Sequence, residues 1–320
     1  MALVSLVASA LFIYNDFNQL RKTIELAAVF SSNFYLSFKQ GYFDLNATEN
    51  PVLHIWSLAV EEQYYLIFPL FLLFIYKKAG NLKSIFKFTL ILFILLLLTS
   101  FIPNNFYKDV LHQPNTYYLS NLRFPELLIG SLLAIYNINP PANHTFNKNL
   151  IGNFSFLLLL ACLYFYHNKL VFIPRVSLVL PCLLAALVIY TTTQDSIVKK
   201  LLSTKPMVFI GKISYSLYLY HWVFISFAYY ITGTKQIDNQ IALLVTALTV
   251  LFSVLSYYLI EQPIRKSKLS FKQEFLYLYV IPSVFVIGYN TYERKQIKNE
   301  KIQINQEILL TDVNTTLPAK

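Results

Sequence analysis

Residues 53–73 read LHIWSLAVEEQYYLIFPLFLL, and this stretch decides the fold class. It is apolar over the roughly 20 residues that a bilayer crossing needs, yet it carries adjacent carboxylates at Glu61 and Glu62. His54 lies seven residues before Glu61, so a helix places both on one face. Adjacent side chains point about 100° apart on a helix, so at least one Glu must face a polar cavity or an internal cation. The alternative is that the pair anchors the helix at lipid headgroups.

The composition extends this interpretation to the whole chain. Of 320 residues, 56% are hydrophobic and 13% are charged, and the mean hydropathy is +0.50. Soluble domains are about 25% charged. The net charge of +10 lies in short basic runs between apolar stretches, which indicates membrane loops and no nucleic-acid partner. Cys162 and Cys182 both fall in apolar stretches and indicate no disulfide framework. We therefore predict an all-α, polytopic transmembrane helix bundle.

The apolar segments predict about nine crossings and one re-entrant or interfacial helix. The re-entrant helix is expected at residues 23–38, because that segment is short and carries the polar residues Glu25, Ser31, Ser32 and Asn33. Basic clusters at 77–87, 199–212 and 265–272 follow alternate spans and predict that these loops are cytoplasmic. The expected domains are a membrane domain over 1–290 and a polar extracytoplasmic tail over 291–320. The nine predicted crossings are residues 2–14, 54–76, 85–102, 117–136, 150–166, 176–191, 207–231, 240–260 and 274–289.

A second polar group lies in YYLSNLRFPELLIGSLLA, residues 117–134. Arg123 and Glu126 are three residues apart on one helical face and can pair directly. Pro125 between them is expected to loosen the helix. A structural ion pair and a binding role both remain open, since the desolvation of a buried pair offsets much of its attraction.

A third polar group lies in IGKISYSLYLYHWVF, residues 210–224, where Ser214 and His221 share a helical face. A neutral His satisfied by a neighbouring hydroxyl and a catalytic His both fit this pattern. Residues 257–266, YYLIEQPIRK, end a span, and the charge of Glu261 is expected at the membrane interface. The histidines show no metal-ligand spacing, so no metal site is predicted.

In this order the segments resemble the acyltransferase-3 family of integral membrane O-acyltransferases, which includes O-antigen acetylases. That resemblance implies transfer of an acyl group, usually acetyl, from cytoplasmic acyl-CoA to a sugar hydroxyl of lipopolysaccharide O-antigen, peptidoglycan or another surface glycan. It also implies a multi-pass protein of the bacterial inner membrane. The blocks that carry the resemblance are SNFYLSFKQGYFD (32–44), PVLHIWSLAVEEQYYLIFPL (51–70), LRFPELLIGSLLA (122–134), IGKISYSLYLYHW (210–222) and YYLIEQPIRK (257–266).

The resemblance supplies candidate site residues from these blocks. A His would act as general base towards the acceptor hydroxyl while a carboxylate orients it, and an Arg is suited to hold donor phosphates. The catalytic candidates are His54, Glu61, Glu62 and His221, and the substrate-binding candidates are Trp56, Tyr64, Arg123, Glu126, Ser214 and Tyr218.

The sequence also departs from the family pattern. Members open with a helix that carries a catalytic His, followed by a cytoplasmic Arg-x-x-Arg motif, whereas residues 1–31 contain no His and only Arg21 and Lys22 as basic residues. The resemblance therefore implies that the first two helices are missing. By the same resemblance, the sequence is expected to lack the extracytoplasmic esterase-like domain that is fused to some members, and such a domain is a candidate partner.

Two other functions remain as alternatives: an inactive remnant or scaffold, and a small-molecule transporter. The transporter alternative predicts inverted repeats and helices broken by Gly or Pro. We see neither, and the chain has only 7 Gly.

Overall fold

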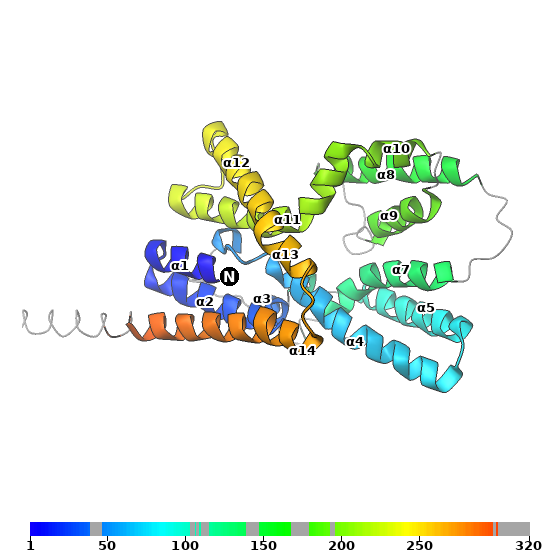
Figure 1. Cartoon of the computed structure of the whole chain (residues 1–320), viewed down its shortest axis with the longest axis horizontal. Coiled ribbons are helices and arrows are strands. Elements are labelled where there is room, and N and C mark those ends of the chain that lie inside the picture. The colour runs from blue at the N-terminus through cyan, green and yellow to red at the C-terminus, as the bar shows by residue number, and fades with distance from the viewer. Residues whose placement is uncertain are drawn as a thin grey trace, which may run out of the picture. The chain divides into compact units, whose positions relative to one another are not determined.

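The computed structural model of this chain is helical throughout the residues it describes, with no strand among them (Figure 1). The predicted all-α class is therefore confirmed. Of the predicted polar tail, residues 297–298 and 300–320 lie outside the described residues, and residues 291–296 are helical. The described residues are 1–38, 47–102, 106, 109, 115–138, 147–167, 179–192, 196–296 and 299.

Five helices in the described part of the chain are long and apolar enough to cross a membrane. Each has at least 18 residues, which at 1.5 Å per residue is about 27 Å and close to the hydrocarbon thickness of a bilayer. A multi-pass membrane protein is thus confirmed, whereas the count of nine crossings stays a prediction. The five are Ile55–Ala79, Leu82–Thr99, Lys148–Phe165, Asn239–Arg265 and Phe271–Gln296.

Two of the predicted crossings correspond to shorter helices. Helix α1 (Ala2–Leu11) has 10 residues and α9 (Val179–Thr191) has 13. At 1.5 Å per residue the described helices reach about 15 and 20 Å, less than a bilayer core. Residues 176–178 of the second of these predicted crossings lie outside the described residues.

The segment 23–38, predicted as one re-entrant or interfacial helix, is divided between two helices. It comprises the end of α2 (Tyr14–Ala28) and all of α3 (Ser32–Phe38). Between them Phe30 has a φ of 54°, in the left-handed region that non-glycine residues rarely adopt. The Gln63 side-chain amide donates to the Phe30 carbonyl at 2.6 Å, which satisfies a main-chain group left open by the break.

The chain divides into two compact units. The first comprises residues 1–29, 40–54 and 216–320, and the second comprises 30–39 and 55–215. Helix α11 (Lys205–Thr232) begins in the second unit and ends in the first.

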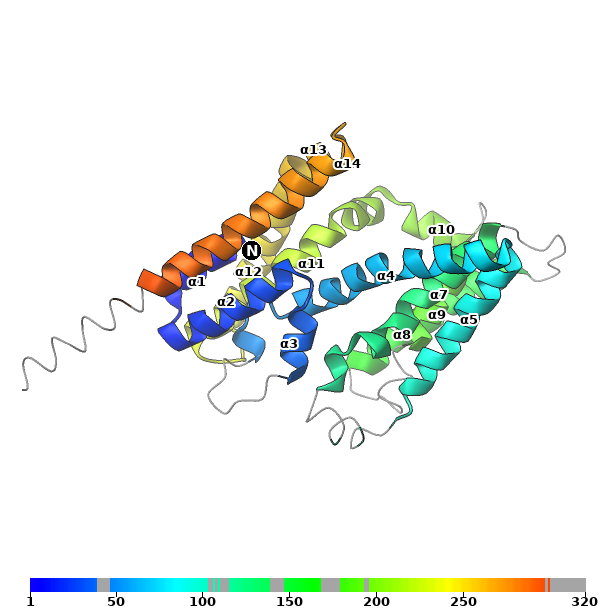
Figure 2. The ribbon, with the colours of Figure 1, turned by 90° about the horizontal axis from the view of Figure 1, so that it is seen from below.

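In the second unit, the helices α4 (Ile55–Ala79), α5 (Leu82–Thr99), α7 (Ser120–Ile138), α8 (Lys148–His167) and α9 pack against one another (Figure 2). Helix α4 packs on α5 and on α7, and α8 packs along α9. Tyr64, Phe68 and Leu128 form a buried core between α4 and α7. Helix α7 runs unbroken through Pro125, which was expected to loosen it and is fully buried.

The first unit is built from α1, α2, the second part of α11, α12 (Asn239–Ser256), α13 (Gln262–Arg265) and the last helix, which begins with α14 (Phe271–Glu274). Tyr230 of α11 stacks on Phe12 with ring centroids 3.9 Å apart and accepts a hydrogen bond from the Ile13 amide. Its own hydroxyl donates to Asp16 at 3.1 Å. This one side chain therefore holds the turn between α1 and α2 against α11.

Candidate functional site

Three candidate residues meet in the first unit. His54, in the turn before α4, lies against Tyr218 and His221, which are one turn apart on α11. The ring centroids of His54 are 5.2 Å from Tyr218 and 5.7 Å from His221. The Tyr218 hydroxyl donates to the main-chain carbonyl of His54 at 2.7 Å. The structure thus brings together residues that the sequence analysis took from two separate blocks.

The main chain of α11 fixes the tautomer of His221. Its Nδ1 lies 2.7 Å from the carbonyl oxygen of Tyr218 and 3.2 Å from that of Leu217. A carbonyl oxygen can only accept, so Nδ1 must carry the hydrogen. In the neutral ring the lone pair then belongs to Nε2. His221 therefore has the protonation pattern of a general base whose accepting atom is Nε2.

His54 is buried, with 8% of its surface exposed. Burial, reinforced by the nearby His221, lowers the pKa of His54 to about 4. At neutral pH its imidazole is therefore uncharged. A base with so low a pKa is a weak proton acceptor at neutral pH. The contacts of Nδ1, which leave Nε2 as the accepting atom, make His221 the candidate for proton abstraction.

The turn that carries His54 is held by two residues that the sequence analysis missed. The Trp222 indole donates to the Asn50 carbonyl at 2.9 Å. The Asn50 side chain accepts from the Val52 amide at 3.1 Å, which closes an Asx-type turn, and donates to Thr23 of α2. An Asn-Pro pair before an apolar run was the available signal for a turn, but nothing in the spacing indicated its partner on α11.

A second missed contact lies between α11 and the end of α12. The Ser216 hydroxyl, which is fully buried, donates a hydrogen bond to Glu261, and Arg265 lies 3.4 Å from the same carboxylate. Only 11% of the Glu261 side chain is exposed, so its carboxylate is largely buried, and its place at the membrane interface stays a prediction. Residues 257–261 form a π-helical turn, a widened turn that is frequent at functional sites. The candidate Ser214 is exposed, and its hydroxyl donates to the Gly211 carbonyl of its own helix.

The second unit contains the predicted Arg123–Glu126 ion pair, at 2.9 Å. The guanidinium lies over the ring of Tyr117 at 4.4 Å and of Trp56 at 5.1 Å, and its Nε donates to the Tyr117 carbonyl. Only 11% of the Arg123 side chain is exposed. A planar guanidinium stacked in this way is fixed in orientation, which a Lys could not reproduce. Arg123 and Trp56, both candidates for binding, are therefore neighbours.

Beside this group lies a ring of hydrogen bonds that the sequence analysis did not predict. The Asn33 amide donates to Ser120 at 2.9 Å, Ser120 donates to Gln63 at 2.6 Å, and Gln63 donates back to Asn33 at 2.9 Å. Every group in the ring is both donor and acceptor, so none is left unsatisfied. The ring joins α3, α4 and the start of α7, and α7 carries Arg123 on its first turn.

The remaining candidates occupy different environments on α4. Glu61 is half-buried and Glu62 is exposed, as expected of adjacent residues on a helix. Tyr64 is buried in the core, with its hydroxyl 2.7 Å from that of Ser131. Within the described residues, no group of three or more His, Cys, Asp or Glu side chains is arranged to hold a metal ion.

Comparison with known proteins agrees with the sequence pattern. Residues 3–259 match the family model described as an acyltransferase domain. The chain is 63% identical over 200 residues to an uncharacterized protein of Haemophilus influenzae, covering 62% of this chain and 81% of that protein. No solved structure matches the chain.

Two Staphylococcus aureus proteins are also similar. One is the O-acetyltransferase OatA, 33% identical over 257 residues, which are 75% of this chain and 41% of that protein. The other is a putative O-acetyltransferase, 31% identical over 281 residues, which are 83% of this chain and 45% of that protein. The chain therefore spans less than half the length of these two O-acetyltransferases.

Proposed function

This chain belongs to the acyltransferase-3 family, and from that membership we propose that it is a membrane O-acyltransferase of the bacterial inner membrane. The proposed donor is cytoplasmic acetyl-CoA, and the proposed acceptor is a sugar hydroxyl of a cell-envelope glycan such as O-antigen or peptidoglycan. The similarity to two O-acetyltransferases supports the acetyl group and the oxygen acceptor.

The structural observation that carries the proposal is the tautomer of the His221 ring. Its Nδ1 is held by two main-chain carbonyls, so Nε2 is the accepting atom. We assign Nε2 the role of general base, with Tyr218 and the neutral His54 packed around the ring to position it. A positioned base of this kind contributes about 10²–10⁴-fold to a reaction rate.

In the proposed step, Nε2 takes the proton of the acceptor hydroxyl while the hydroxyl oxygen attacks the thioester carbonyl carbon. A C–O bond forms and the C–S bond breaks. The CoA thiolate then recovers the proton from the imidazolium, so the products are the sugar ester and free CoA. No other reactant is required.

The test uses the full chain in membrane vesicles supplied with acetyl-CoA labelled in its acetyl group. We expect alkali-labile label in the glycan fraction, and its initial rate should fall at least about 100-fold in His221→Ala. The matched control is Tyr220→Phe, one residue away, whose ring packs on Phe224 and Phe252; its rate should remain unchanged.

Undiminished acyl transfer by His221→Ala would show that His221 is not the general base. If the unsubstituted, correctly inserted chain gave no transfer to any envelope glycan, the proposal would be wrong for this chain and the inactive-scaffold alternative would hold.

A further inference from the structure

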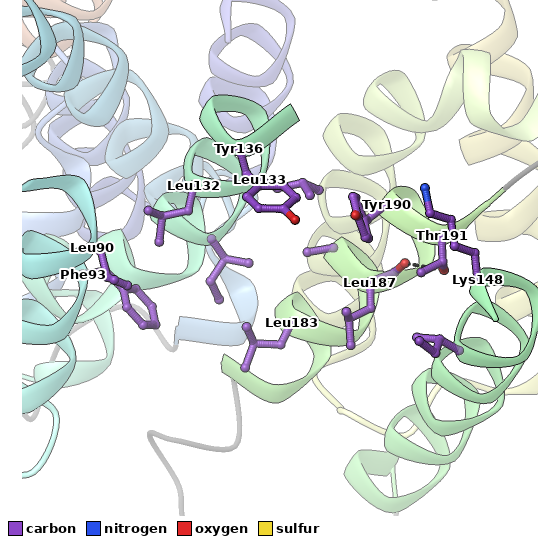
Figure 3. Close-up of a pocket in the computed structure, with 13 residues that line it drawn as sticks. Leu90, Phe93, Leu132, Leu133, Tyr136, Lys148, Leu183, Leu187, Tyr190 and Thr191 are labelled. Carbon is purple, nitrogen blue, oxygen red and sulfur yellow. Dashed lines mark hydrogen bonds between the residues drawn. The ribbon is translucent and has the colours of Figure 1, made fainter. Parts of the chain in front are cut away.

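A cavity of about 480 Å³ lies between α5, α7, α8 and α9 of the second unit (Figure 3). Its lining is almost wholly apolar, with Leu90, Phe93, Leu132, Leu183 and Leu187 among its residues. The volume falls within the range of about 300–1,000 Å³ that is usual for sites of small ligands. Such a lining offers a sugar almost no hydrogen-bonding partner, and it suits a hydrocarbon chain.

One end of the cavity is polar. Lys148, Tyr136 and Tyr190 gather there, and Leu90 and Phe93 lie on the opposite side (Figure 3). The Lys148 ammonium lies 5.3 Å from the centre of the Tyr190 ring, and the rings of Tyr136 and Tyr190 pack edge to face at 5.7 Å. From Leu183 to Thr191 the cavity follows α9 over nine residues, or about 12 Å along the helix axis. The cavity is thus amphipathic along its length, and Lys148 at one end is the only cation among its described lining residues.

The polar end belongs to the basic end of this unit. Helices α7 and α9 end near Tyr136 and Tyr190, and α8 begins at Lys148. Phe86, in the second turn of α5, contacts Tyr136 with ring centroids 6.5 Å apart, so the first turns of α5 lie at the same end. These turns carry Lys83 and Lys87, and α10 (Ile197–Leu202), which packs on α8, adds Lys199 and Lys200. The distribution of basic residues predicts that this end is cytoplasmic.

We propose that this cavity binds an anionic phospholipid of the cytoplasmic leaflet. One acyl chain would enter between Leu183, Leu187 and Leu132, and the phosphate would pair with Lys148. Charge complementarity selects this occupant, because the cation of a zwitterionic headgroup offsets its phosphate and reduces its gain from Lys148, whereas basic pockets between transmembrane helices favour acidic headgroups. The binding residues lie on α7, α8 and α9, outside the residues assigned to acyl transfer.

The test uses the full chain purified in detergent and measures bound lipid by native mass spectrometry. The probes are dioleoylphosphatidylglycerol, the zwitterionic dioleoylphosphatidylcholine, and palmitoyl-CoA as a competitor. The unsubstituted chain should retain one phosphatidylglycerol and far less phosphatidylcholine. Lys148→Ala should weaken phosphatidylglycerol binding by roughly tenfold or more, as expected for loss of a charge-assisted bond.

Matched variants separate the site from the general charge of this end. Lys200→Ala, on the exposed face of α10, should bind as tightly as the unsubstituted chain. Leu187→Trp should fill the cavity and lower binding as strongly as Lys148→Ala does. The Tm of each lipid-free variant shows whether that variant folds. If Leu187→Trp does not fold, the proposal is tested by Lys148→Ala alone.

Three results would overturn the proposal. Equal retention of the two phospholipids would show that the cavity binds membrane lipid without selecting its headgroup. Equal effects of Lys148→Ala and Lys200→Ala would remove the assigned headgroup contact. Displacement of phosphatidylglycerol by equimolar palmitoyl-CoA, with loss of that competition in Lys148→Ala, would assign the cavity to a long acyl donor instead.

Discussion

The hydroxyl of Tyr218 donates to the main-chain carbonyl of His54 at 2.7 Å, a contact that joins residues 164 positions apart. Tyr218 also contributes the carbonyl that fixes Nδ1 of His221. One residue of α11 thus positions both histidines of the first unit, through its side chain on one and its main chain on the other.

Tyr218→Phe should separate these two roles. It removes the donor to His54 and leaves the carbonyl that holds His221. The lost hydrogen bond should lower the free energy of unfolding by about 0.5–1.5 kcal/mol, measured by thermal unfolding in detergent. Acyl transfer should fall less than in His221→Ala. An equal fall in both variants would show that the hydroxyl itself takes part in the reaction.

The burial of His54 predicts a loss of stability in acid. Burial and the neighbouring His221 lower its pKa from 6.5 to about 4. Between pH 4 and pH 6.5, His54 is protonated in the unfolded chain but neutral in the folded chain. The free energy of unfolding is therefore highest above about pH 6.5 and falls as the pH drops towards 4. The total effect is at most about 3 kcal/mol. It is measured as Tm between pH 8 and pH 4.

His54→Gln is the matched variant, because it keeps a polar side chain of similar size and cannot be protonated. Its Tm should depend less on pH over that interval than the Tm of the unsubstituted chain. Parallel curves for the two proteins would show that His54 is not the group responsible.

The Arg123–Glu126 pair should behave as a coupled unit. Glu126→Gln leaves a nearly buried guanidinium without its carboxylate and should cost about 1.5–3 kcal/mol of unfolding free energy. Arg123→Lys keeps the charge but loses the stacking on Trp56 and Tyr117, so it should also destabilise. The double variant Arg123→Gln/Glu126→Gln should lose less unfolding free energy than the sum of the losses measured for Arg123→Gln and Glu126→Gln separately. Simple additivity would mean that the pair is not coupled.

Gly152 permits the close packing of α8 on α9. A Cβ at this position would lie 2.7 Å from Oγ1 of Thr191, a buried residue whose hydroxyl is already bonded to the Leu187 carbonyl at 2.6 Å. Gly152→Ala should therefore cost about 1–3 kcal/mol of unfolding free energy, seen as a lower Tm. Thr191→Ala in the same chain should recover part of that loss.

Gly130 is the control for this substitution. It lies inside α7, and an added Cβ would meet nothing within 4 Å. Gly130→Ala should leave stability unchanged or raise it by up to about 1 kcal/mol, since alanine favours a helix over glycine. If both Gly variants lost the same stability, the close approach at Thr191 would not be the cause.

Local spacing predicted the features that depend on one helix alone. The Arg123–Glu126 pair follows from a separation of three residues, and the different exposure of Glu61 and Glu62 follows from their adjacency. The apolar runs predicted the long helices, with boundaries displaced by a few residues. These properties need no knowledge of which helices are neighbours.

Features that depend on a partner far along the chain were not accessible in this way. Ser214 and Ser216 look equivalent in the sequence, yet only Ser216 is buried, because Glu261 lies opposite it. The roles of Asn50 and Trp222 depend on each other, across 172 residues. The break at Phe30 was missed for the same reason, since the amide that satisfies its carbonyl belongs to Gln63.

The ring of Asn33, Gln63 and Ser120 has a consequence for the order of synthesis. Asn33 leaves the ribosome first, but its two partners follow 30 and 87 residues later. The ring cannot close until the first residue of α7 has emerged. Until then α3 can contact α4 directly through Gln63, but the two hydrogen bonds of Ser120 that complete the ring are missing. The two bonds of Ser120 are therefore the last of the ring to form during synthesis, because α7 is made after both α3 and α4.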